Sequence, residues 1–217
     1  MFSLATRLHM ARLALIVEAD QADVYDLAGV MHAGIDLLII KSSSDGAADE
    51  QTLRSFREQW AQTQMLLGTS NQEAAERAAA DVVHNFKPGW FSRHLTRPHE
   101  WSLLGRNARD ARAIRSPGEE YNYLIIGPTD DPESRAVQAA LESQPPLVIE
   151  SLPWFVQCSP EVVPGMLAGG ARRFAFELSK LEETDPAEAV HDALALVDAA
   201  WKQDERAQGY RSQAFAL

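Results

Sequence analysis

Eight short apolar runs recur at fairly even spacing along the chain, and polar stretches with helical periodicity separate them. The runs occupy 13–20, 35–44, 63–70, 80–85, 100–107, 121–131, 146–153 and 172–180. Their apolar residues are nearly continuous, which is typical of strands in a sheet that is covered on both faces. A strand and a helix repeated eight times with short connections predict a single α/β domain, closed into a (β/α)8 barrel. An open doubly wound sheet is the alternative, but it rarely uses eight such evenly spaced units.

Three of the intervening stretches carry clear helical patterns. Residues 49–62 place Leu53, Phe56 and Trp60 on one face, and residues 186–201 form a second amphipathic stretch. The alanine-rich stretch 71–80 is the third, with Ser70 as its expected N-cap. We expect the barrel to span 11–201, with 1–10 as an N-terminal extension and 202–217 as a C-terminal tail.

Charge and cysteine content narrow the classes of partner. The 217 residues are 46% hydrophobic, which suits one globular domain, and their formal net charge of −11 argues against nucleic acid or a polybasic membrane contact. Cys158 is the only cysteine, so a disulfide framework is excluded. The opening residues do not read as a secretory signal, and no apolar run approaches the roughly 18 residues of a membrane span. We therefore expect a cytoplasmic protein with a small-molecule ligand.

The C-terminal ends of the barrel strands carry the active site in this architecture, so the residues that follow each apolar run are the site candidates. These ends are polar throughout. The candidate catalytic residues are Lys41, Glu18 and Glu150, where the lysine holds an anion and a glutamate acts as general base. The candidate ligand-binding residues are His84, Asn107, Arg109, Thr129, Ser151 and Glu177.

A basic block lies between Lys87 and Arg115. It contains seven lysines and arginines, opposed only by Glu100 and Asp110. In a protein this acidic, such a block indicates an anion site near strands four and five, with a phosphate as the expected ligand. The alternative is a solvated helix face formed by Arg109, Arg112 and Arg115.

Support for a metal site is weak. The six histidines form neither an H-x-x-x-H nor an H-E-x-x-H pair. Carboxylates at separate strand ends could converge on Mg²⁺, which prefers oxygen ligands; these are Asp20, Asp130, Glu150 and Glu177. No metal ligand is assigned on this basis. The absence of a G-x-S-x-G elbow and of a Walker loop removes serine-hydrolase and P-loop readings.

Five segments follow a known order. AGIDLLIIK (33–41) is similar to a G-x-D-x-x-Q-x-R segment, AADVVHN (79–85) to A-D-G-V-H-L, and 103–128 to I-G-x-S-x-H followed by A-D-Y-x-x-x-G-P. PLVIES (146–151) stands where P-V-x-A-I-G-G is expected, and 175–194 is similar to a closing strand with a D-P-x-x-A helix. In this order and spacing the chain resembles the thiamine-phosphate synthase family and its thiazole-tautomerase relatives.

The resemblance implies a (β/α)8 barrel that couples an aminopyrimidine pyrophosphate to a thiazole phosphate with the help of Mg²⁺. The functional positions of that family are altered here. Its strand-two arginine is Lys41, which keeps the charge but loses the bidentate fork. Its metal carboxylates after strands three and four are replaced by Gly68-Thr69 and by 86–89. Its strand-five serine and histidine correspond to Asn107 and Arg109.

Two further departures concern the phosphate and the tautomerase chemistry. Glu150-Ser151 stands where the resemblance implies phosphate-binding glycines, and a carboxylate there would repel a phosphate. The tautomerase histidine corresponds to Pro128. Mg²⁺ is expected as a cofactor only if the transferase activity is retained.

Three readings follow. The first is a divergent barrel of this type that lacks the Mg²⁺-dependent transfer and binds a small ligand, phosphorylated or not. The second is a working transferase or isomerase of thiamine or thiazole metabolism that uses replacement residues. The third is a barrel enzyme of another chemistry, with an acidic pocket of Glu18, Glu150 and Glu177 that suits an amine. A homodimer is also left open, because Trp90, Phe91, Trp154 and Phe155 could form an interface.

Overall fold

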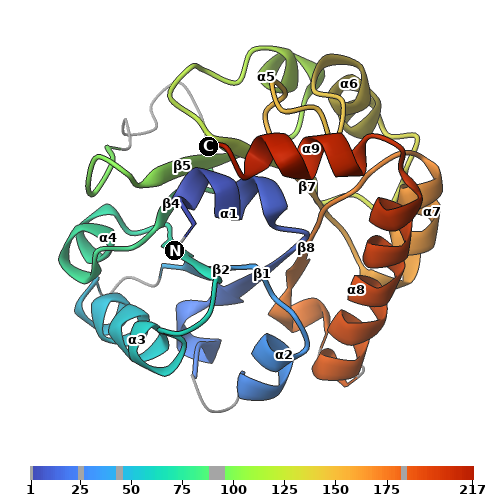
Figure 1. Ribbon diagram of the computed structural model, residues 1–217. Helices are drawn as coiled ribbons and strands as arrows, with labels where there is room; N and C mark the ends of the chain where they lie inside the picture. The colour runs from blue at the N-terminus through green and yellow to red at the C-terminus, as the bar shows by residue number, and fades with distance from the viewer. Residues whose placement is uncertain (1, 24–26, 43–45, 88–95, 182–184) are drawn as a thin grey trace.

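Eight parallel strands close into a barrel in the order of the sequence, which confirms the expected single (β/α)8 architecture (Figure 1). The structure is a computed structural model that describes residues 2–23, 27–42, 46–87, 96–181 and 185–217. The strands are β1 (Leu13–Glu18), β2 (Leu37–Lys41), β3 (Leu66–Thr69), β4 (Val82–Asn85), β5 (Leu103–Ala108), β6 (Tyr123–Ile126), β7 (Trp154–Gln157) and β8 (Phe174–Glu177).

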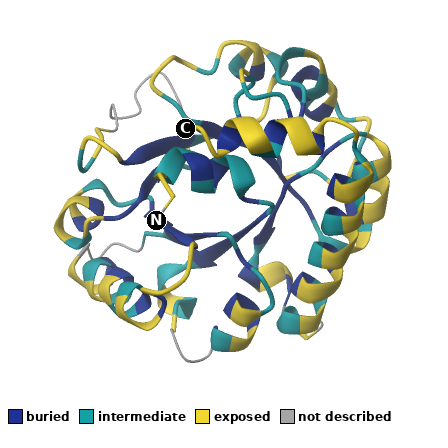
Figure 2. Ribbon diagram, in the orientation of Figure 1, coloured by how far each residue is buried: buried dark blue, intermediate teal, exposed yellow. Residues whose placement is uncertain are grey.

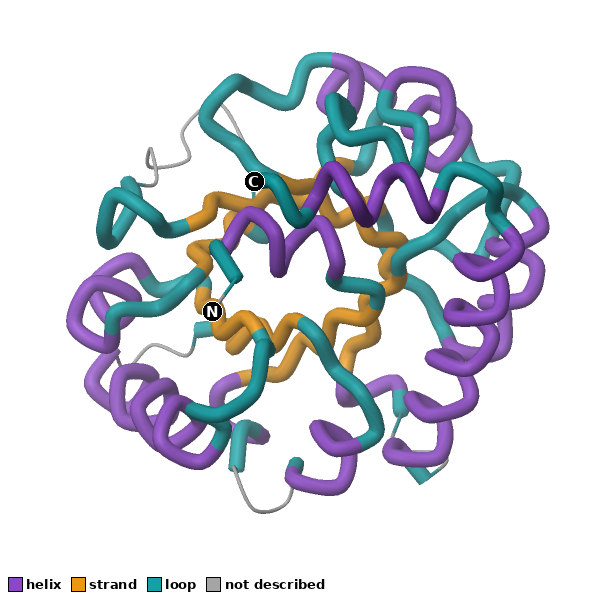
Figure 3. Tube along the Cα trace, in the orientation of Figure 1, coloured by secondary structure: helices purple, strands orange, loops and turns teal. Residues whose placement is uncertain are grey.

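Helices surround the barrel, as the tube view shows most directly (Figure 3). The α-helices are α1 (Leu4–Met10), α2 (Ala28–His32), α3 (Gly46–Gln59), α4 (Gln72–Ala78), α5 (Ala111–Arg115), α6 (Arg135–Ser143), α7 (Val163–Ala168), α8 (Pro186–Gln203) and α9 (Ala207–Ala214). The short 3-10 helices are η1 (Ala19–Gln21), η2 (Pro160–Val162) and η3 (Leu178–Lys180). Among the described residues, no helix is both long enough and apolar enough to cross a membrane.

The core has two layers, and both follow from the apolar runs of the sequence. Side chains such as Ile16, Ile39 and Phe155 fill the barrel interior, while alternate residues such as Val17 and Ile40 pack outward against the helices. Figure 2 accordingly shows a buried ring of strands inside helices whose outer faces are exposed. The helical stripes expected around Leu53 and Val190 are buried on α3 and α8.

The terminal segments are helical and lie together across the N-terminal end of the barrel (Figure 1). Helix α1 begins after Ser3, whose hydroxyl accepts a hydrogen bond from the Thr6 N–H at 3.0 Å, and it plugs the barrel with the buried Leu8. Helix α9 packs on α1 and supplies Tyr210, whose hydroxyl oxygen accepts a hydrogen bond from Arg173 at 2.7 Å. Residues 1–10 and 202–217 were expected to extend from the barrel, and their described parts close one end of it.

Three local expectations are wrong. Residues 146–151 form turns, not strand seven, and β7 begins only at Trp154. The N-cap of α4 is Asn71, whose side chain accepts a hydrogen bond from the Ala74 N–H, in place of Ser70. Trp154 and Phe155 are buried on β7, so they offer no interface. Trp90 and Phe91, the other two aromatic residues of that expectation, lie outside the described residues.

Candidate functional site

A polar cluster lies inside the barrel beneath its C-terminal mouth. His84 at the end of β4 is fully buried, and its Nδ1 lies 2.9 Å from the Tyr123 hydroxyl. Its Nε2 lies 2.8 Å from Oδ1 of Asn107 on β5. Gly105 stands between His84 and Tyr123 in the sheet register, and a Cβ there would lie 2.1 Å from Cζ of Tyr123. The glycine therefore admits the tyrosine ring and lets its hydroxyl reach the histidine.

The hydrogen bonds of this cluster assign the protonation of His84. An amide oxygen only accepts, so Nε2 of His84 donates to Asn107, and Nδ1 accepts from the Tyr123 hydroxyl. Burial lowers the pKa of His84 to about 4, against the opposing effect of its bond to Asn107, so the ring is neutral at pH 7. His84 was predicted as a ligand-binding residue. In the structure both of its nitrogens are used inside the core, and it positions Asn107, which lines a cavity at the mouth.

Lys41 and Glu18 neutralise each other. They are register partners at the ends of β2 and β1, and the Lys41 ammonium donates to Oε1 of Glu18. The same ammonium lies 5.9 Å from the ring centroid of Phe86, within range of a cation–π interaction. The pair is half-exposed at the mouth. The sequence correctly predicted that both residues lie at the mouth. In the structure the two side chains form an ion pair with each other.

The loop after β6 is held against the end of β7. Gly127 has a φ of 114°, and a Cβ there would lie 2.8 Å from the Gln157 carbonyl oxygen. The Thr129 N–H donates to that carbonyl at 2.9 Å. The Ser159 N–H donates to Oδ1 of Asp130 at 2.8 Å, and the Ser159 hydroxyl donates to Oδ2 at 3.2 Å. Asp130 thus occupies the donors that the loop after β7 would offer to an anion.

Two cavities of about 460 Å³ each meet at Arg109. One is lined by Phe86, Lys87, Arg106, Asn107, Arg109, Asp110 and Ala113. The other lies between the end of β6 and the first turn of α6, and it is lined by Arg109, Gly127, Pro128, Thr129, Ser134, Arg135 and Ala136. We call this second cavity the β6–α6 cavity. Volumes of this size are in the range of small-molecule sites.

The β6–α6 cavity is cationic. It has two arginines and no acidic lining residue. In the described part of the chain, neither Arg109 nor Arg135 has a hydrogen-bond or ion-pair partner for its guanidinium. The Ser134 hydroxyl caps α6 by accepting from the Val137 N–H, which leaves the preceding N–H groups of the first turn facing this end. These groups together form an arrangement that attracts an anion.

Two solved structures have a fold similar to that of this chain. A thiamine phosphate pyrophosphorylase from Pyrococcus furiosus superposes with a TM-score of 0.68 at 15% identity, covering 91% of this chain and 99% of that chain. A thiamine phosphate pyrophosphorylase from Bacteroides thetaiotaomicron gives 0.60 at 12% identity, covering 89% and 99%. The chain has a thiamine-phosphate-synthase-like fold. No family model and no curated protein sequence matches the chain.

The positions at which the family resemblance implies metal carboxylates do not offer them here. Gly68 lies inside β3 against Val82, and the buried Thr69 uses its hydroxyl to accept from the Asn71 N–H at 3.1 Å. Phe86 follows β4 and packs on His84 with ring centroids 4.5 Å apart. Across the described residues, no group of three His, Cys, Asp or Glu side chains is arranged to hold a metal ion. The donors of the described residues do not fit Mg²⁺, and residues 88 and 89 of the second expected segment lie outside the described part of the chain.

The remaining predicted site residues divide between the two ends of the barrel. Thr129 lines the β6–α6 cavity, and Glu177 lies half-buried at the end of β8. Glu150 and Ser151 precede β7, so they lie at the opposite end from the mouth. Their expected position after strand seven is wrong. Glu150 therefore does not lie where it would repel a phosphate at the mouth. Cys158 and Ser159 follow β7 instead.

The basic block contributes unevenly to the mouth. Arg97 donates to the Ser102 carbonyl and to Asn122, Arg106 donates to the Pro117 carbonyl, and Arg115 pairs with Glu142. Arg109 alone of these residues reaches both mouth cavities. Arg93 lies outside the described residues.

Sequence reasoning missed two residues of the site. Arg135 stands in a helix rather than at a strand end, and only the Ser134 N-cap signal after the Gly127-Pro128-Thr129 loop could have indicated it. Gln157 was hidden because strand seven was misplaced. It points into the barrel beside Phe155 in the strand alternation, and its Oε1 is buried without a hydrogen-bond partner among the described residues.

Proposed function

We propose that this protein binds a small phosphorylated ligand in the β6–α6 cavity and does not carry out a Mg²⁺-dependent transfer. The observation that carries the proposal is the pair Arg109 and Arg135, whose guanidinium groups have no partner among the described residues, in a cavity that no described carboxylate lines. A guanidinium binds phosphate oxygens through two parallel hydrogen bonds, and two such groups can hold one phosphate from both sides. The N-terminal turn of α6 adds N–H donors and a favourable dipole.

The β6–α6 cavity has the opposite charge to the protein as a whole. The chain carries a formal charge of −11, so anions are repelled from most of its surface. A cavity with two arginines and no acid is a local exception. Thr129 lies on the same wall, where its N–H donates to the Gln157 carbonyl and its hydroxyl accepts from the Asp131 N–H at 3.2 Å. The ligand that matches these donors has a phosphate group and a body that fits about 460 Å³.

The arrangement of the mouth argues against the transferase reading. That reading needs oxygen ligands for Mg²⁺ and a free cation for the departing pyrophosphate. Gly68-Thr69 and residues 86–89, of which 88 and 89 lie outside the described residues, stand at the expected ligand positions, and Lys41 is bound to Glu18. No step through a metal is therefore derived for this chain.

The acidic-pocket reading also loses support. One of its three carboxylates, Glu150, is at the other end of the barrel, and Glu18 is neutralised by Lys41. Glu177 is the member of the set that stays at the mouth without a hydrogen-bond or ion-pair partner among the described residues. One half-buried carboxylate does not make a binding site for an amine.

The experiment is a titration of the full chain with thiamine phosphate, inorganic pyrophosphate and unphosphorylated thiamine, each with Mg²⁺ and with EDTA. Thermal unfolding and calorimetry are recorded together. A ligand at 100 times its Kd should add about 2.7 kcal/mol to the free energy of unfolding. We expect stabilisation by the phosphorylated compounds, little by thiamine, and the same result with EDTA. Failure of every phosphorylated compound to bind would contradict the site, and Mg²⁺-dependent formation of thiamine phosphate at an ordinary enzyme rate would contradict the loss of transfer.

A further inference from the structure

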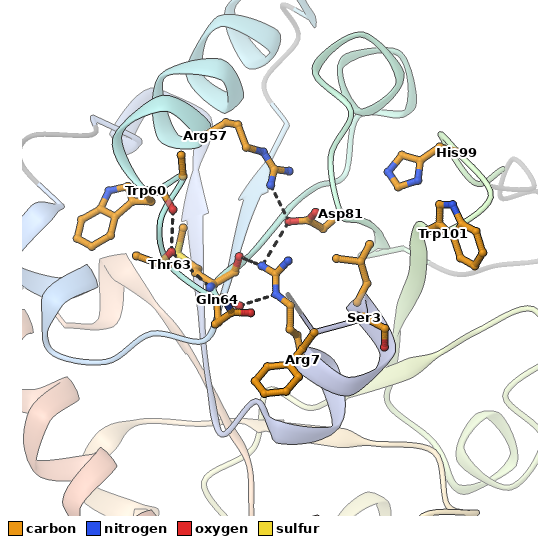
Figure 4. Close-up of a pocket in the computed structure, with 13 residues that line it drawn as sticks. Ser3, Arg7, Arg57, Trp60, Thr63, Gln64, Asp81, His99 and Trp101 are labelled. Atoms are coloured by element: carbon orange, nitrogen blue, oxygen red, sulfur yellow. Dashed lines mark hydrogen bonds and ion pairs between the residues drawn. The ribbon is translucent and has the colours of Figure 1, made fainter. Parts of the chain in front are cut away.

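A further cavity lies at the N-terminal end of the barrel, opposite the mouth. It has a volume of about 440 Å³ and lies between α1, the C-terminal end of α3 and the segment before β5 (Figure 4). Its apolar wall includes Phe2, Leu4, Met65 and Trp101. Its polar wall is formed by Arg7, Arg57 and Asp81. We call it the α1–α3 cavity.

The polar wall carries one uncompensated positive charge. Oδ2 of Asp81 lies 3.2 Å from Nη1 of Arg57 and 3.9 Å from Nη2 of Arg7, so two guanidinium groups share one carboxylate. Figure 4 shows both side chains directed at Asp81 from separate elements. The same oxygen also accepts from the Leu67 N–H at 2.9 Å, which fixes the carboxylate at the base of β3. Two guanidinium groups thus face a single carboxylate, and the Arg7–Asp81–Arg57 cluster has an excess positive charge.

Arg7 keeps an unused donor in this wall. Its Nε donates to the Gln64 carbonyl at 2.7 Å and its Nη2 donates to the Met65 carbonyl. Its Nη1 has no hydrogen-bond partner among the described residues. The side chain is only 9% exposed, and burial lowers the pKa of Arg7. A guanidinium that is held largely out of water interacts more strongly with an anion than a solvated one does.

The rim of the cavity exposes an unusual amount of aromatic surface. The Trp101 side chain is 71% exposed and Phe2 is 52% exposed. In Figure 4, Trp101 stands across the cavity from the Arg7–Asp81–Arg57 cluster. An indole at such a rim can cover the apolar body of a bound molecule whose charged end reaches the arginines.

We propose that the α1–α3 cavity is a binding site for a small amphiphilic carboxylate, in which one carboxylate is attached to an aromatic or aliphatic body. The carboxylate of the ligand pairs with Nη1 of Arg7 and with the excess positive charge that Arg7 and Arg57 share. The body lies along Phe2, Leu4 and Met65 and under Trp101. A monoanion matches the single excess charge, whereas a phosphate dianion would be left partly unpaired beside apolar walls. The site is independent of the function proposed for the mouth.

The test uses three probes with one body, which are 4-phenylbutyrate, 4-phenylbutanol and 4-phenylbutylamine, titrated into the full chain by calorimetry. The expected order of affinity is carboxylate, then alcohol, then amine. The ¹H–¹⁵N signal of the Trp101 indole should move on titration with the carboxylate, while that of the buried Trp201 should not. Equal affinity for the acid and the amine, or no binding of the acid up to the millimolar range, would overturn the proposal.

Variants locate the binding and separate charge from packing. Trp101→Ala changes an exposed side chain, so it should leave the fold intact and weaken all three probes by about fivefold or more. Arg57→Gln should abolish the preference for the acid over the alcohol. Arg54→Gln, on the exposed side of the same helix, is the matched control and should keep that preference. Arg109→Gln, at the other end of the barrel, should not change phenylbutyrate binding; loss of binding in that variant would place the probe at the mouth and overturn the proposal.

Discussion

The hydroxyl of Tyr123 and Nδ1 of His84 lie 2.9 Å apart in the centre of the barrel, on strands that are separated by β5. The contact crosses the intervening strand above Gly105, where no side chain blocks it. Nε2 of His84 in turn donates to Asn107, so the fixed histidine orients Asn107 on the wall of a mouth cavity. A buried histidine that the sequence predicts as a ligand-binding residue is thus part of the support for the site.

Gly105→Ala should destabilise the protein by about 3 kcal/mol, because overpacking of a closed core forces side chains off their rotamers. The added Cβ would lie 2.1 Å from Cζ of Tyr123 and displace the ring that bonds His84. Urea unfolding measures the change. Gly209→Ala on α9 is the control, since nothing lies within 4 Å of its added Cβ; it should be neutral or stabilising by about 0.5–1 kcal/mol. Equal effects of the two substitutions would contradict the packing described at Gly105.

Stability should fall as the pH is lowered, in part because of His84. Its pKa is about 4 in the folded protein and about 6.5 when unfolded, so the unfolded state binds more protons between these values. Lowering the pH from about 6.5 to about 5 should cost about 2 kcal/mol through this residue alone. His84→Gln should flatten the urea-derived stability profile in that range, whereas His191→Gln on the exposed face of α8 should not. A remaining slope is expected from His9, whose pKa is also lowered to about 4 by burial and by Arg173.

Asp130→Ala should strengthen phosphate binding at the mouth by a few-fold. The substitution removes a negative charge from the loop that contributes Thr129 to the β6–α6 cavity, and it frees the Ser159 N–H and hydroxyl. Calorimetric titration with pyrophosphate measures the effect. Glu150→Ala is the control, because Glu150 lies at the far end of the barrel. If Glu150→Ala strengthened binding and Asp130→Ala did not, the assignment of the two barrel ends would be wrong.

Most of the fold could be predicted because buried parallel strands leave continuous apolar runs. Seven of the eight predicted runs contain or overlap the strands of the structure. The exception, 146–151, has the same apolar texture but turns beneath the barrel, with Leu147 at a φ of 57°. The true β7 has four residues, and its start is set by the Pro153 carbonyl accepting from the Leu124 N–H. Hydrophobicity does not encode that pairing, so the sequence pattern favoured the longer apolar run at 146–153 as strand seven.

The site was less predictable, for reasons of pairing in space. Strand ends correctly indicated Lys41, Glu18, Asn107, Arg109 and Thr129 as residues of the mouth. Whether such a residue is free depends on partners that are distant in the sequence, such as Glu18 for Lys41 at a separation of 23 residues. Arg135 was missed because only residues at the strand ends were taken as candidates, although the first turn of the helix after a strand also lies at the mouth of such a barrel.

Calorimetric titration of arginine variants with pyrophosphate in EDTA tests whether Arg109 and Arg135 together bind a phosphorylated ligand. Arg109→Gln and Arg135→Gln should each raise the Kd about tenfold, since each removes charge-assisted hydrogen bonds worth about 1.4 kcal/mol. Arg112→Gln, an exposed arginine of α5 that lines neither mouth cavity, is the matched control and should keep the Kd of the unmodified protein. The double variant should no longer bind pyrophosphate in the measurable range. Unchanged binding of pyrophosphate by the double variant would contradict the proposed site.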